Sequence, residues 1–358
     1  MALVNKQILK STSLVKTSWR FPFKTMENIQ VIDIMRCLAV WLVVAFHSAS
    51  RGIPLQNNFL HLIWHRGVNG LYGVYMFFVI SGFLITRLIA SNPNGLFHPD
   101  FREFYSRRIG RILPLLTLIC FIGLIFIFYI PITAFSREGV FTIPFSPFNP
   151  YFWISIGTFW FNWYTAAFMR QPGGFWAVLW SLSVEEQFYF FFPFVLKCIR
   201  NELNLKIFLL VFIILGPVSQ YIGYCFYRRN YCIEHNSFTG FGLIATGSLL
   251  YLISERYRTY FLQHKKLCVY VCLFGFLMTC KIYFHQSYIT DYFGNTFYPM
   301  FFGIFLSIFL LGALFLDFFK SKRWWAIALN GRVSYGIYLF HVIVICTVVS
   351  FFHSARVP

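Results

Sequence analysis

The sequence has few charged residues. Only 12% of its 358 residues are Asp, Glu, Lys or Arg, whereas soluble domains carry about 25%. The chain is 58% hydrophobic, and no stretch long enough for a soluble domain remains once its apolar runs are set aside. This composition argues against a soluble globular fold and indicates a polytopic membrane protein.

Acidic residues are especially scarce, with 12 against 30 basic ones and a formal net charge of +18. In a soluble protein this excess would suggest nucleic acid as a partner. Here the basic residues stand in short clusters between apolar runs, which is typical of cytoplasmic loops beside anionic lipid. A basic–aromatic RNA-binding motif is also missing. We therefore expect membrane lipids, and no nucleic acid, as partners.

Metal-binding motifs are missing too. The nine cysteines form no CxxC pair, and HExxH does not occur. His61 and His65 stand four apart in HLIWH, but no acidic residue or cysteine stands near them, so we expect no metal site. Cys225 and Cys232 could both lie outside the cytoplasm and form a disulfide, or remain two free thiols.

Residues 1–25 are basic and lack the long apolar core of a signal peptide. Met26 is a plausible alternative start. We expect a basic cytoplasmic tail over 1–30, a membrane domain over 31–353 and a short C-terminal tail over 354–358.

Nine apolar runs approach the roughly 20 residues that cross a bilayer. They are residues 33–50, 70–90, 112–132, 176–196, 206–227, 237–253, 267–284, 299–318 and 333–352. Residues 151–169 are rich in Trp and Tyr, which suits an interfacial or re-entrant segment as well as a short span. We predict an all-α bundle of nine to eleven transmembrane helices around a polar cavity.

Basic clusters set the expected orientation. The first, from Lys6 to Lys24, places the N-terminus in the cytoplasm. Four later clusters are Arg87 to Arg111, Lys197 to Lys206, Arg256 to Lys266 and Lys320 to Arg323. All five share one side if 151–169 does not cross, and the side of the C-terminus stays open. The expected location is the inner (plasma) membrane.

The first run places ionisable residues on one helical stripe. Arg36 and His47 are eleven positions apart, so they lie roughly 20° apart around a helix and roughly 16 Å apart along it. Asp33 is close to the same stripe. Since charge facing lipid is costly, the stripe should face a cavity or the bundle interior. His47 is then either a general base or a buried hydrogen-bonding histidine, and Asp33–Arg36 is either part of a site or a boundary ion pair.

The second run and the loop after it add further candidates. Gly73 and Gly82 suit close helix packing, and Ser81 places a hydroxyl inside the membrane. Arg108 and Arg111 share a helix face and could hold a phosphorylated ligand, although plain positive-inside signalling is the better explanation of an isolated RxxR.

The segment WSLSVEEQFYF (180–190) carries two adjacent carboxylates. Ser181, Glu185 and Tyr189 recur every four residues and share one strip of a helix. Glu186 lies about 100° further round, so we expect it at the membrane surface or beside an arginine. The carboxylates could bind a sugar hydroxyl, orient a histidine or pair with arginine.

These segments together resemble the membrane-bound acyltransferase-3 family of integral-membrane O-acyltransferases. The matching pieces are IDIMRCLAVWLVVAFHS (32–48), GVYMFFVISGFLIT (73–86), RRIGRILPL (107–115), WSLSVEEQFYFFFP (180–193) and SYGIYLFH (334–341). The last piece carries Tyr335, Tyr338 and His341. The resemblance covers essentially the whole chain.

The resemblance implies transfer of an acyl group from cytoplasmic acetyl-CoA or another acyl-CoA, used as a substrate with no permanently bound cofactor. The acceptor would be a hydroxyl of a cell-surface or lipid-linked glycan. It implies His47 and Glu185 as catalytic residues. The implied contacts of the CoA phosphates are Arg36, Arg108 and Arg111. Supporting or acceptor positions would be Asp33, Ser81, Ser181, Tyr189, Tyr338 and His341.

Two other functions fit the residues alone. The chain could be a transporter or flippase for a lipid-linked sugar, with its intramembrane Arg, His and Glu forming a substrate or proton path. It could also be a structural subunit of an envelope assembly, with the same residues serving as packing contacts. No internal repeat is visible, and the sequence does not indicate an oligomeric state.

Overall fold

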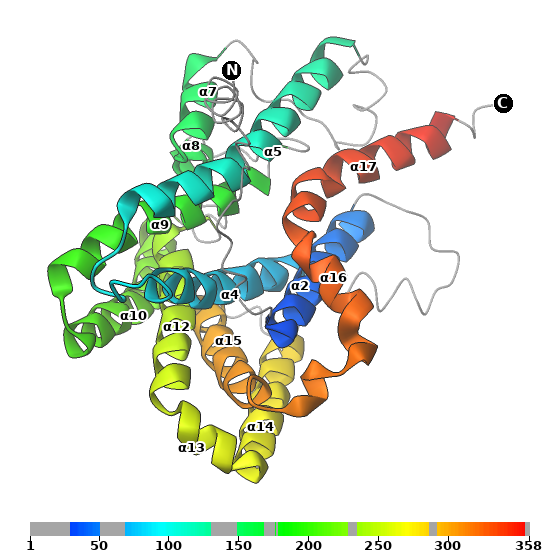
Figure 1. The fold of residues 1–358 in the computed structure, drawn as a ribbon. Coiled ribbons are helices and arrows are strands. Elements are labelled where there is room, and N and C mark those ends of the chain that lie inside the picture. The colour runs from blue at the N-terminus through cyan, green and yellow to red at the C-terminus, as the bar shows by residue number, and fades with distance from the viewer. Residues whose placement is uncertain are drawn as a thin grey trace, which may run out of the picture.

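The computed structural model describes residues 29–50, 69–129, 149–167, 176, 178–227, 235–285 and 292–354. All elements in these ranges are helices (Figure 1). The long ones are α2 (Gln30–Ser50), α4 (Gly70–Ala90), α5 (Phe101–Tyr129), α9 (Leu179–Ile199), α10 (Glu202–Tyr227), α12 (Ser237–Arg256), α14 (Lys265–His285), α15 (Tyr292–Ala313) and α17 (Ser334–Ser354). Each of the nine apolar runs of the sequence falls on one of these nine helices.

Shorter helices connect them. They are α7 (Pro150–Gly157), α8 (Phe161–Ala167), α13 (Arg258–Gln263), the 3₁₀ turns η3 (Asp317–Lys320) and η4 (Lys322–Trp324), and α16 (Trp325–Arg332). Helices α7 and α8 are formed by the described part of the Trp-rich segment 151–169. Neither approaches the roughly 20 residues of a span, which favours the interfacial or re-entrant alternative.

Seven helices in the described ranges are long and apolar enough to cross a membrane, and an eighth span results if the bent pair 322–332 and 334–349 counts as one. This is the architecture of a multi-pass membrane protein. Helix α9 has 21 residues but contains Glu185, Glu186 and Lys197, and it is not among the seven. The expected total of nine to eleven spans, and a bundle built around a polar cavity, stay predictions.

Helix α4 lies at the centre of the fold, between α2 and α12 (Figure 1). Glycines allow both contacts. A Cβ on Gly82 would lie 1.8 Å from the Ile244 carbonyl oxygen of α12, and one on Gly73 would lie 2.5 Å from the Ala39 carbonyl oxygen of α2. The close packing expected at Gly73 and Gly82 is therefore confirmed.

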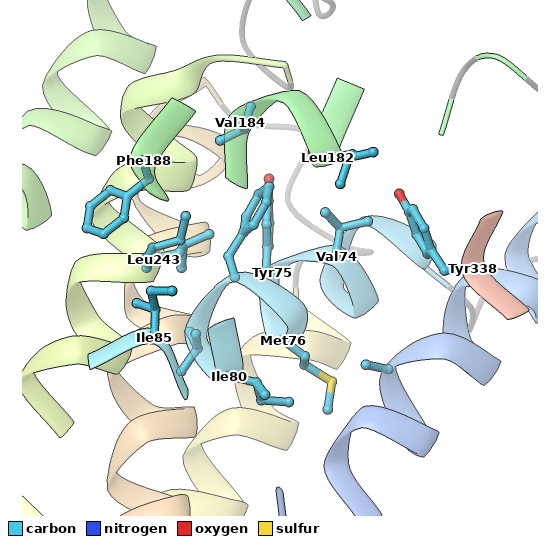
Figure 2. Packing of buried hydrophobic residues seen from close by; sticks show 14 of the residues in the cluster. Val74, Tyr75, Met76, Ile80, Ile85, Leu182, Val184, Phe188, Leu243 and Tyr338 are labelled. Atoms are coloured by element: carbon cyan, nitrogen blue, oxygen red, sulfur yellow. The ribbon is translucent and has the colours of Figure 1, made fainter. Parts of the chain in front are cut away.

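A further part of the α4 surface packs against α9. Figure 2 shows Val74 and Tyr75 of α4 pointing toward Leu182 and Val184 of α9, with Tyr338 of α17 beside Val74. All five side chains are buried in one hydrophobic cluster. Helices α4, α9 and α17 therefore meet where the candidate site is built.

Contacts bring the basic ends of the helices to one side of the fold. Gln30 at the start of α2 donates to the Ser321 carbonyl (2.9 Å), and Lys197 at the end of α9 lies over the Phe101 ring at the start of α5 (5.3 Å). Arg256 of α12 pairs with Glu202 of α10, and Lys265 of α14 pairs with Asp317 of η3, each at 3.5 Å. We call this side the basic face.

Several sequence predictions concern residues outside the described ranges. These are the N-terminal tail up to residue 28, the histidine pair His61 and His65, and Cys232, for which a disulfide with Cys225 and a free thiol are both open.

Candidate active site

A cavity of about 100 Å³ lies between α2, α4, α5, α9 and α17. Five charged side chains line it, three arginines and two glutamates: Arg36, Arg108, Arg111, Glu185 and Glu186. The hydroxyl-bearing lining residues are Ser81, Ser181, Ser334, Tyr189, Tyr335 and Tyr338. Apolar side chains, including Val74, Phe77 and Leu182, complete the wall. Five segments far apart in the sequence thus contribute to one site.

Helix α9 contributes the carboxylates. Ser181, Glu185 and Tyr189 all line the cavity, as their shared helical strip predicts. The Tyr189 hydroxyl donates to Glu185 Oε2 over 3.5 Å, and Ser81 of α4 also hydrogen-bonds the Glu185 side chain. Glu186 faces the cavity as well, where the charge of Arg108 acts on it. The expectation that Glu186 meets an arginine agrees with this placement, while the alternative position at the membrane surface stays open.

Helix α5 contributes the two arginines of the RxxR motif. Both line the cavity, and the Arg108 guanidinium stacks over the Tyr189 ring with 4.2 Å between Cζ and the ring centroid. Such a cation–π contact stabilises arginine where water is scarce. Pairing with Tyr189 leaves the guanidinium hydrogen-bond donors directed along its plane, where a carboxylate or phosphate can bind.

Arg36 completes the basic wall from α2. Its Nη1 lies 3.8 Å from Asp33 Oδ1, and Asp33 Oδ2 accepts a hydrogen bond from Arg332 Nε at 3.0 Å. Asp33 is buried and is shared by two arginines, of which Arg36 alone lines the cavity. The boundary ion pair considered for Asp33 and Arg36 is therefore present, and it also orients Arg36.

A hydroxyl pair links α9 to α17. The oxygens of Ser181 and Tyr338 lie 2.7 Å apart, and both hydroxyls also reach the Val178 carbonyl. Both residues line the cavity, and Phe77 packs edge-on against the Tyr338 ring.

His47 does not line this cavity, but it meets a second histidine beside it. His341 of α17 is buried, and its Nε2 lies 3.0 Å from His47 Nδ1. His341 Nδ1 contacts the Tyr338 carbonyl at 2.6 Å, while His47 Nδ1 also contacts the Val43 carbonyl at 3.1 Å. A chain of contacts thus joins His47 through His341 to Tyr338 on the cavity wall.

The carbonyl contacts define the neutral tautomers of both rings. A carbonyl oxygen only accepts, so each Nδ1 that faces one carries the proton. His47 Nδ1–H is then shared between the Val43 carbonyl and the lone pair of His341 Nε2. The remaining lone pair of His47 lies on Nε2, which is the nitrogen that can take a proton.

A second polar cluster holds α8 against α9 and α12. Gln187 donates to Asn162 Oδ1 (2.8 Å) and accepts from Ser237 (2.8 Å), which in turn accepts from Asn162 (2.8 Å). His235 contacts Thr165, and its ring stacks on Trp180. Burial lowers the pKa of His235 to about 4, so this imidazole is neutral near pH 7. The cluster fixes the N-terminal part of α9, next to Ser181.

Sequence reasoning missed two of these features. Ser334 lines the cavity next to Tyr335, although only Tyr335 of that pair had been singled out in SYGIYLFH. Arg332 is 299 positions from its partner Asp33, and no local pattern indicates that contact.

No group of three His, Cys, Asp or Glu residues suited to a metal occurs in the described part of the chain.

The fold and the site define a class: a multi-pass, all-helical membrane protein with a charged cavity beside a histidine pair. Within this class, the chain belongs to the acyltransferase-3 family. The family model, described as an acyltransferase domain, matches residues 29–357. The match begins and ends within a few residues of the expected membrane domain.

Two named relatives show the same relationship. The chain is similar to the O-acetyltransferase OatA of Staphylococcus aureus (strain NCTC 8325), with 25% identity over 340 residues that cover 91% of this chain and 52% of OatA. It is also similar to the peptidoglycan O-acetyltransferase OatA of Listeria monocytogenes, with 28% identity over 197 residues, 54% of this chain and 28% of that protein. The chain thus spans about half the length of the staphylococcal relative. No solved structure matches it.

Proposed function

We propose that this protein is an O-acetyltransferase that moves an acetyl group from cytoplasmic acetyl-CoA to a hydroxyl of a cell-wall or lipid-linked glycan. The match to the acyltransferase family over nearly the whole chain carries this proposal. The names of the two OatA relatives support acetyl as the group and a glycan as the acceptor. The protein would reside in the inner membrane with its N-terminus in the cytoplasm.

The donor site in this proposal is the arginine wall of the cavity. Arg36, Arg108 and Arg111 offer planar donor groups that suit phosphate oxygens. In the topology set by the basic clusters, the basic face is cytoplasmic, so acyl-CoA would approach the arginines from that side. Glu185, held among them by Ser81 and Tyr189, would position the arginines and bind a hydroxyl of the acceptor.

His47 is the proposed base. Its Nε2 would take the proton of the acceptor hydroxyl while the oxygen attacks the thioester carbonyl carbon. The C–S bond then breaks, an ester forms, and the proton passes to the thiolate to give free CoA. His341 keeps the proton of His47 on Nδ1 by accepting from it, and the resulting imidazolium can share its charge with the same neighbour.

Purified protein tests the proposal directly. The protein in detergent or liposomes is given acetyl-CoA together with peptidoglycan fragments or a lipid-linked saccharide. We expect release of the CoA thiol that depends on the acceptor, and acetylated saccharide detectable by mass spectrometry. Transport of the saccharide across liposomes without CoA release would instead identify a transporter and refute the enzymatic proposal.

A further inference from the structure

Two hydroxyls on the cavity wall have no hydrogen-bond partner within the described part of the chain. Ser334 is fully buried, with 0% of its surface exposed, and its Oγ is unpaired. The hydroxyl of Tyr335 is equally inaccessible and unpaired. Buried polar groups are nearly always paired, so an unpaired hydroxyl that lines a cavity indicates a group that the cavity binds.

The same two residues begin a long helix. Helix α17 begins at Ser334, after a 61° bend that separates it from 322–332. The first N–H groups of a helix lack partners within the helix, and that end carries a partial positive charge. A helix N-terminus with a hydroxyl beside it is a common site for phosphate groups. Here the buried hydroxyl of Ser334 adds the side-chain donor.

The arginines share the same cavity. Three arginines against two glutamates leave one positive charge in excess among the lining residues. The charges of Glu186 and Glu185 act on Tyr335 most strongly, and the charge of Arg111 acts on it as well. An anion in the cavity would meet guanidinium groups and the two hydroxyls at the start of α17, with Glu185 and Glu186 on the same wall.

The bend before α17 is fixed to α2. A Cβ on Gly331 would lie 1.7 Å from the Asp33 carbonyl oxygen, so α16 touches the backbone of α2. The next residue, Arg332, pairs with the Asp33 side chain. Because Asp33 also pairs with Arg36, one carboxylate fixes both the basic wall and the start of α17.

We propose that Ser334, Tyr335 and the first turn of α17 form a phosphate-binding subsite that works together with the arginines. The ligand is a phosphate or pyrophosphate group. Its assignment to the phosphate-bearing part of the acyl donor rests on the function proposed above. The thioester end of the donor would then point away from α17's first turn, along the cavity toward Tyr338 and the histidine pair.

Ligand binding by the full-length protein in detergent tests the subsite. The probes are CoA, inorganic pyrophosphate and S-acetylpantetheine, which carries a thioester but no phosphate. Ser334→Ala and Tyr335→Phe each remove one hydroxyl. Losing a hydrogen bond to a charged group should weaken CoA and pyrophosphate binding about tenfold. Binding of S-acetylpantetheine should stay unchanged.

Two matched variants control for the loss of a buried hydroxyl as such. Ser307 and Tyr72 also carry buried, unpaired hydroxyls, but they do not line the cavity. Ser307→Ala and Tyr72→Phe should therefore bind CoA as the unaltered protein does. All four variants are compared by size-exclusion profile, so that loss of folding is distinguished from loss of binding.

The outcomes separate this inference from the proposed function. If the unaltered protein transfers acetyl groups while Ser334→Ala and Tyr335→Phe bind CoA normally, the subsite is refuted and the enzyme assignment stands. Equal weakening of CoA and S-acetylpantetheine would also refute a phosphate role. If the unaltered protein binds pyrophosphate through these hydroxyls but never consumes acetyl-CoA, the subsite stands and the proposed function fails.

Discussion

In the proposed mechanism, His47 of α2 takes the proton of the acceptor and His341 of α17 orients the His47 ring. His341 is buried, and its Nδ1–H is directed to the Tyr338 carbonyl, so it offers His47 a lone pair. That acceptor favours the proton of His47 on Nδ1 and leaves Nε2 basic. A ring so oriented is better suited to general-base chemistry than an isolated imidazole, whose two tautomers interconvert.

Replacement of His47 should separate chemistry from folding. A general base contributes typically 10²–10⁴-fold, so we expect His47→Ala to lower acetyl transfer at least about a hundredfold. His47 is half-buried, and the variant should still insert in the membrane and bind CoA. Transfer is measured as acceptor-dependent CoA release. Near-normal transfer by this variant would disprove the assigned role.

His341 provides the comparison for that experiment. Its proposed function is to accept a hydrogen bond, which the amide oxygen of Gln can reproduce and Ala cannot. We therefore expect His341→Gln to retain more activity than His341→Ala, measured as kcat at equal amounts of membrane protein. Equal loss in both variants would show that the imidazole of His341 does more than orient His47.

Among the elements, the crossing of α4 and α12 tolerates no side chain at its centre. A Cβ on Gly82 would lie 1.8 Å from a backbone carbonyl of α12, and that carbonyl belongs to a helix that cannot shift alone. Overpacking typically costs about 1–3 kcal/mol, so Gly82→Ala should clearly lower the thermal unfolding midpoint in detergent. Gly223→Ala in α10 is the control, because a Cβ there meets nothing within 4 Å. Equal midpoints for the two variants would contradict this packing.

The cluster that holds α8 against α9 and α12 makes stability depend on pH. Burial lowers the pKa of His235, in the loop before α12, from its ordinary value of 6.5 to about 4. Between those values the unfolded chain binds more protons than the folded one, so stability falls as pH decreases. From pH 7 to pH 5 the loss should reach about 2 kcal/mol.

This dependence can be assigned to His235 by substitution. Unfolding midpoints are measured at pH 5 and pH 7 for the unaltered protein and for His235→Gln, which keeps a polar side chain but does not titrate. The difference between the two midpoints should shrink in the variant. An undiminished difference would mean that another group is responsible.

At the scale of the whole molecule, local patterns predicted the helices but not the contacts between their ends. Apolar runs located all nine long helices, and four-residue spacing placed Ser181, Glu185 and Tyr189 on one wall of the cavity. The pairing of His47 with His341 joins positions 294 apart, and no periodicity encodes such a contact. The bend before α17, which places Ser334 at the cavity, likewise depends on packing against α2.

The orientation of the protein is a further whole-molecule property that the charge pattern predicts. Helix α10 carries one exposed cysteine near its far end, Cys225, while Cys198 is exposed at the end of α9, next to the start of α10 on the basic face. Because a helix of 26 residues is roughly 39 Å long, the two thiols should lie on opposite sides of the bilayer. Positive-inside topology places Cys198 in the cytoplasm.

Two single-cysteine variants, retaining either Cys198 or Cys225, test this arrangement in intact cells with a maleimide that does not cross membranes. Cys225 should react at once, whereas Cys198 should react only after the membrane is permeabilised. The reverse result would place the arginines of the cavity on the extracytoplasmic side, where no acetyl-CoA pool exists to reach them. If the acyl donor comes from the cytoplasm, Cys198 must be protected from the maleimide in intact cells. The chemistry proposed for the cavity therefore depends on the direction in which the whole chain inserts, and the labelling result tests both.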